Sequence, residues 1–73
     1  MSKQSIYTYS GNWGEFRGTP GQGTFLTWGD ADRAAELSRE NPNTIFIVYS
    51  KGDWLSAWSR GYLLSRPEFR ING

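Results

Sequence analysis

The sequence predicts an α+β domain in which one helix packs on a small sheet of three to four mainly antiparallel strands. Three observations point to this class. Residues 44–50, T-I-F-I-V-Y-S, contain the only run of five consecutive large apolar residues, which is typical of a buried central strand. Two earlier segments alternate as strands do, and a helix-forming segment separates them from this strand. The expected order is β-β-α-β, followed by a mixed C-terminal segment.

Two strands are expected before the helix. The first covers residues 4–10, where the two tyrosines share one face. The second covers residues 23–28, and strict alternation would place Leu26 and Trp28 on one face and Phe25 on the other. We expect the two strands to pair antiparallel, because segments adjacent in sequence are usually adjacent in space.

A glycine-rich loop is expected between these strands. Residues 11–23 hold five of the nine glycines of the chain, a density that disfavours a regular helix. The loop also carries Trp13 and Phe16, which disordered linkers seldom contain. Two interpretations remain open: the rings fold back over the core, or they stay exposed beside Arg17 and anchor a partner.

The helix is expected over residues 31–40, with Asp30 as its N-cap. The segment 41–43, Asn-Pro-Asn, ends it, because the residue before a proline avoids the α region. Ala34 and Ser38 belong to a face of small side chains that allows close packing on a sheet. The carboxylates of the helix are interpreted as a solvated face and not as a catalytic set.

The C-terminal part is ambiguous. A turn is expected over residues 50–53, and the preferred structure for residues 54–60 is a short helix ended by Gly61. Residues 62–64 are expected to add a strand at the sheet edge, and residues 67–73 to form a loose tail. The apolar spacing leaves open whether the segment after the turn is helical or extended.

Composition excludes several classes of protein. The chain of 73 residues forms a single small domain, and it has neither Cys nor His. A disulfide, a thiolate zinc site and histidine general-base chemistry are therefore impossible. No phosphate-binding glycine motif and no pair of carboxylates across a cleft is recognisable. We expect no enzymatic activity, no cofactor and no metal.

Charge and hydropathy indicate the compartment and the partners. The net charge of +1 is too small for a dedicated nucleic-acid-binding domain. No apolar segment is long enough to cross a membrane, and we expect no signal peptide, because no apolar h-region is recognisable before the first expected strand. We therefore expect a cytoplasmic monomer without a membrane partner.

Aromatic and basic residues mark the candidate surfaces. Large aromatic and arginine side chains are enriched at interface hot spots, and aromatic side chains interleaved with basic ones suit single-stranded nucleic acid. The alternative, which we favour for the C-terminal part, is that the tryptophans are core and the arginines a solvated rim. The candidate partner-binding residues are Trp13, Phe16, Arg17, Trp54 and Trp58. The candidate RNA-facing residues are Lys51, Arg60, Arg66 and Arg70.

The whole chain, which opens M-S-K-Q-S-I-Y-T-Y-S-G-N-W-G-E-F-R-G, resembles a class of small bacteriophage-encoded regulators of bacterial RNA polymerase. The resemblance implies binding to the N-terminal region of the β′ subunit in the host cytoplasm. It also implies inhibition of initiation, by disfavouring the σ-bound enzyme, and antitermination near the RNA exit channel. Contact with nascent RNA would be indirect. The alternatives are another phage blocking protein, of the anti-CRISPR or anti-restriction type, and a weak module for single-stranded nucleic acid.

Overall fold

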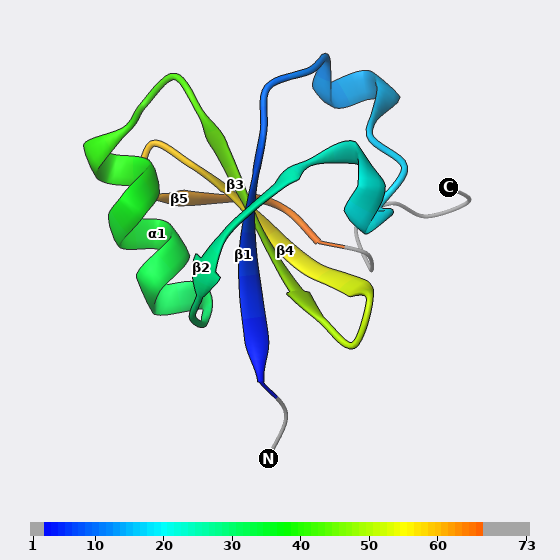
Figure 1. The fold of residues 1–73 in the computed structure, drawn as a ribbon. Helices are drawn as coiled ribbons and strands as arrows, with labels where there is room; N and C mark the ends of the chain where they lie inside the picture. Colours follow the sequence, from blue (N-terminus) through cyan, green and yellow to red (C-terminus); the bar gives the residue numbers. More distant parts are fainter. Residues whose placement is uncertain (1–2, 67–73) are drawn as a thin grey trace.

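A computed structural model describes residues 3–66 of the chain. Five strands form one antiparallel sheet in the order β2-β1-β3-β4-β5, and one helix packs on it (Figure 1). The predicted α+β class is confirmed, with one strand more than the upper expectation. The elements are β1 (Gln4–Tyr9), η1 (Trp13–Glu15), η2 (Pro20–Gln22), β2 (Thr24–Trp28), α1 (Ala31–Glu40), β3 (Ile45–Ser50), β4 (Asp53–Ser59) and β5 (Tyr62–Ser65).

Strand β3 is the centre of the sheet, as its apolar run predicted. It pairs with β1 on one side and with β4 on the other. The four residues from Phe46 to Tyr49 are all buried, so both faces of the strand contribute to the core. One face is covered by the helix and the other by the glycine-rich segment of residues 11–23.

The helix has the predicted bounds and the predicted N-cap. A side-chain oxygen of Asp30 accepts a hydrogen bond from the backbone N–H of Arg33 at 3.2 Å. On its inner face Ala34 and Ser38 are fully buried. Ala34 packs with Ile6 and other buried residues of the sheet, so small side chains bring the helix close to the strands.

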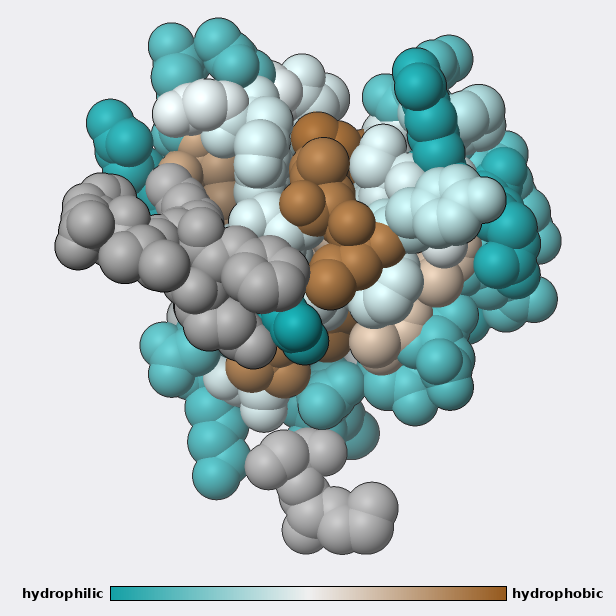
Figure 2. Space-filling view, turned by 180° about the vertical axis from the view of Figure 1, so that it is seen from behind, coloured by the Kyte–Doolittle hydropathy of each residue, from teal (hydrophilic) through white to brown (hydrophobic). Residues whose placement is uncertain are grey.

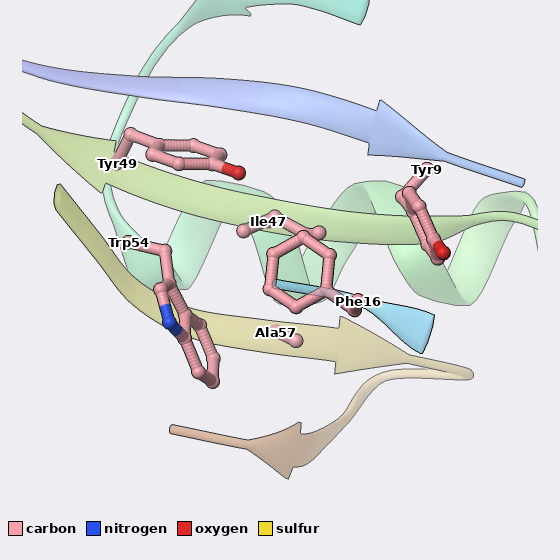
Figure 3. Packing of buried hydrophobic residues seen from close by; sticks show 6 residues of the cluster. All are labelled: Tyr9, Phe16, Ile47, Tyr49, Trp54 and Ala57. Carbon is pink, nitrogen blue, oxygen red and sulfur yellow. The ribbon is translucent and has the colours of Figure 1, made fainter. Parts of the chain in front are cut away.

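The second face of the sheet carries a separate aromatic cluster (Figure 3). Phe16, from the glycine-rich segment, lies over the middle of this face and is 0% exposed. Trp13 stacks on it, with ring centroids 4.7 Å apart and planes inclined by 14°. The interpretation in which the rings fold back over the core is therefore the one that the structure shows. The buried members of the cluster are Tyr9, Phe16, Ile47, Tyr49, Trp54 and Ala57.

Three β-bulges interrupt the sheet, and a leucine is the extra residue in each. Leu26 is inserted in β2 opposite β1, Leu55 in β4 opposite β3, and Leu64 in β5 opposite β4. Each insertion shifts the alternation of side chains by one residue. Phe25 and Trp28 therefore lie on the same face, opposite Tyr7 and Ser5 respectively, and the expected separation of these two aromatic residues is wrong.

The helix preferred for residues 54–60 is also wrong, because this segment is strand β4. Strand β5 follows it through a tight turn, which confirms the edge strand expected over residues 62–64. Arg60 and Gly61 both have positive φ, of 55° and 84°, as a two-residue hairpin turn requires. The tail expected over residues 67–73 lies outside the described residues.

Candidate protein-binding surfaces

The glycine-rich segment is held on the sheet by hydrogen bonds as well as by its rings. The hydroxyl of Tyr49 donates to the carbonyl oxygen of Thr19 at 2.9 Å, and the hydroxyl of Tyr9 donates to that of Asn12 at 2.9 Å. The side-chain amide of Gln22 donates to the carbonyl of Glu15 at 3.2 Å and accepts from the backbone N–H of Arg17. These contacts make the segment a fixed layer of the fold.

The predicted partner-binding residues divide into buried and accessible side chains. Phe16 and Trp54 are buried and belong to the aromatic cluster, where they hold the glycine-rich segment on the sheet. Trp13 is half-buried above them, and Trp58 is half-buried on the helix-covered face, where its ring N–H donates to Ser56 Oγ at 2.8 Å. Arg17 is exposed.

The predicted RNA-facing residues are not gathered in one place. Lys51 and Arg60 are exposed at the turns before and after β4, so the length of this strand separates them. Both have a φ of 55°, a conformation that Asn and Gly adopt more readily than a basic residue does. Arg66 is half-buried, and Arg70 lies outside the described residues.

Apolar side chains on the two edge strands form two separate surfaces, at opposite edges of the sheet, and none of these side chains is among the predicted site residues. Three of the seven exposed large hydrophobic residues among the described residues lie on β2 and three on β5. Figure 2, from behind the view of Figure 1, shows an apolar strip between polar side chains on the β5 side. The exposed residues are Phe25 (44%), Leu26 (47%), Trp28 (57%), Leu55 (39%), Tyr62 (78%), Leu63 (36%) and Leu64 (41%).

The aromatic residues on β2 continue a row of rings across the sheet. Trp28 contacts Phe25 at a centroid distance of 5.1 Å, Phe25 contacts Tyr7 at 5.6 Å, and Tyr7 contacts the buried Tyr49 at 4.8 Å. Trp28 and Phe25 are therefore the accessible end of this row of packed rings. The absence of a charge among the five residues of β2 was visible in the sequence and is the signal for an apolar edge. Strict alternation nevertheless predicted opposite faces for Phe25 and Trp28, whose rings share one face in the structure.

Charge is distributed unevenly over the described residues. From Asp30 to Glu40 there are four carboxylates and two arginines, and a salt bridge of 3.0 Å joins Arg33 to Glu36. Within residues 3–66 no cluster of His, Cys, Asp and Glu is suited to hold a metal ion. In the same range no helix is long and apolar enough to cross a membrane.

Comparison with known proteins gives no relative: no family model, no curated protein and no solved structure matches this chain.

Proposed function

We propose that this protein is a bacteriophage-encoded binding protein that regulates host RNA polymerase in the bacterial cytoplasm. The choice of target rests on the resemblance of the whole chain to such regulators. The observation that supports a protein-binding role is the exposure, within residues 3–66, of seven large apolar side chains, six of them on the two edge strands. Apolar side chains grouped on an exposed surface mark interaction sites, whereas singly scattered ones need no explanation.

In the proposed mechanism the protein binds the N-terminal region of the β′ subunit. Its effect depends on which form of the polymerase, core or σ-bound, it binds more tightly. It inhibits initiation if it binds core polymerase more tightly than the σ-bound enzyme, because a ligand shifts an equilibrium only by its differential affinity. It acts as an antiterminator if the bound protein hinders hairpin formation near the RNA exit channel. Neither action requires a catalytic group.

Retention of polymerase on the immobilised protein tests this proposal. Purified core enzyme and σ-containing holoenzyme are passed over it separately, and a variant of core that lacks the β′ N-terminal segment serves as the control. We expect core to be retained, holoenzyme to be retained less, and the truncated core to pass through. Core enzyme that passes through unretained would contradict the proposal. In transcription assays the protein is expected to reduce promoter-dependent initiation and to increase read-through of a hairpin terminator.

One observation favours a second candidate function, weak binding of single-stranded nucleic acid. Within residues 3–66 Tyr62 is the most exposed large hydrophobic residue, at 78%, and it follows Arg60 by two residues at the β4–β5 turn. An exposed ring next to a cation suits base stacking together with a phosphate contact. Titration of oligouridine at low and high salt tests it: binding that weakens with salt and with Tyr62→Ala supports this candidate, and no binding at low salt excludes it.

A further inference from the structure

We draw no further inference here: the strongest candidate, the exposed apolar patch of Phe25, Leu26 and Trp28 on the edge strand β2, carries none, because nothing in the structure shows what covers it.

Discussion

Gly18 lies directly against the indole ring of Trp54. A Cβ atom at residue 18 would overlap with Cδ1 and Nε1 of this ring, and the φ of Gly18 is +84°. The contact joins the glycine-rich segment to β4, and through Trp54 to the aromatic cluster on the face opposite the helix. Two separate features therefore require glycine at residue 18: the positive φ, and the lack of space for a Cβ atom beside the Trp54 ring.

Gly18→Ala is expected to lower the free energy of unfolding by about 2–4 kcal/mol, because left-handed backbone costs a non-glycine residue about 1–2 kcal/mol and the overlap adds to it. Two controls separate these causes. Gly52→Ala meets positive φ, +87°, but no atom within 4 Å, so about 1 kcal/mol is expected. Gly21→Ala meets neither obstacle and should be nearly neutral. Urea unfolding measures all three, and equal losses for Gly18 and Gly52 would show that the Trp54 contact is unimportant.

Ile47→Asp is expected to unfold the domain. Ile47 is 0% exposed at the centre of the middle strand, where it pairs with Tyr7 and Ala57. A buried carboxylate without a partner costs several kcal/mol, which is comparable with the whole stability of so small a domain. Leu55→Asp, at a side chain 39% exposed, is the control and should remain folded. Circular dichroism of both variants checks this; a folded Ile47→Asp protein would show that the core tolerates a charge there.

Much of this fold follows from local patterns in the sequence. The apolar run of β3 and the bounds and N-cap of the helix depend on neighbouring residues alone, and all of them agree with the structure. The mistaken helix after the β3–β4 turn was expected from the helical spacing of Leu55, Trp58 and Tyr62. In the structure Leu55 is the extra residue of a bulge and Tyr62 lies on the next strand, so this spacing marks no helix face. The bulge at Leu55 places Trp54 and Ala57, three residues apart, on the same face. A spacing of three is also what a helix produces, so a bulged strand imitates a helix in sequence.

The candidate site could be predicted only in part for the same reason. Arg17 was identified from its type and is exposed, but the aromatic surface on β2 was not, because the bulge at Leu26 reverses the expected faces. Which tryptophans are covered depends on where the glycine-rich segment lies. That position is set by long-range contacts, such as the one between Thr19 and Tyr49, which no local pattern encodes.

Ser38→Ala is expected to lower the free energy of unfolding by about 1–3 kcal/mol. The hydroxyl of Ser38 is fully buried, donates to the carbonyl of Ala35 at 2.8 Å and accepts from the backbone N–H of Gly61 at 2.8 Å. Alanine would leave the N–H in the β4–β5 turn without this acceptor. Ser38→Thr, which keeps the hydroxyl but adds a methyl group where space is limited, distinguishes packing from hydrogen bonding. Amide hydrogen exchange at Gly61 should become faster in Ser38→Ala, and unchanged exchange would contradict this role.

Because the pKa of Tyr49 is raised in the folded protein, we expect the domain to lose stability at alkaline pH. Burial, with a smaller contribution from the neighbouring Tyr7, raises the pKa of Tyr49 from 10.0 to about 12. The unfolded chain therefore loses this proton near pH 10, whereas the folded protein keeps it up to about pH 12. The contribution to stability is complete below pH 10 and is lost as the pH rises towards 12, by an amount on the order of 1–2 kcal/mol.

Tyr49→Phe isolates this effect. It removes the hydrogen bond to the carbonyl of Thr19, so a loss of about 1 kcal/mol is expected at neutral pH. Its stability should then fall less steeply than that of the wild type between pH 10 and 12, because the group with the raised pKa is absent. Tyr62→Phe, at a ring 78% exposed, is the control and should follow the wild type. Urea unfolding at successive pH values measures the slopes, and parallel curves for wild type and Tyr49→Phe would show that Tyr49 ionises equally in the folded and unfolded states.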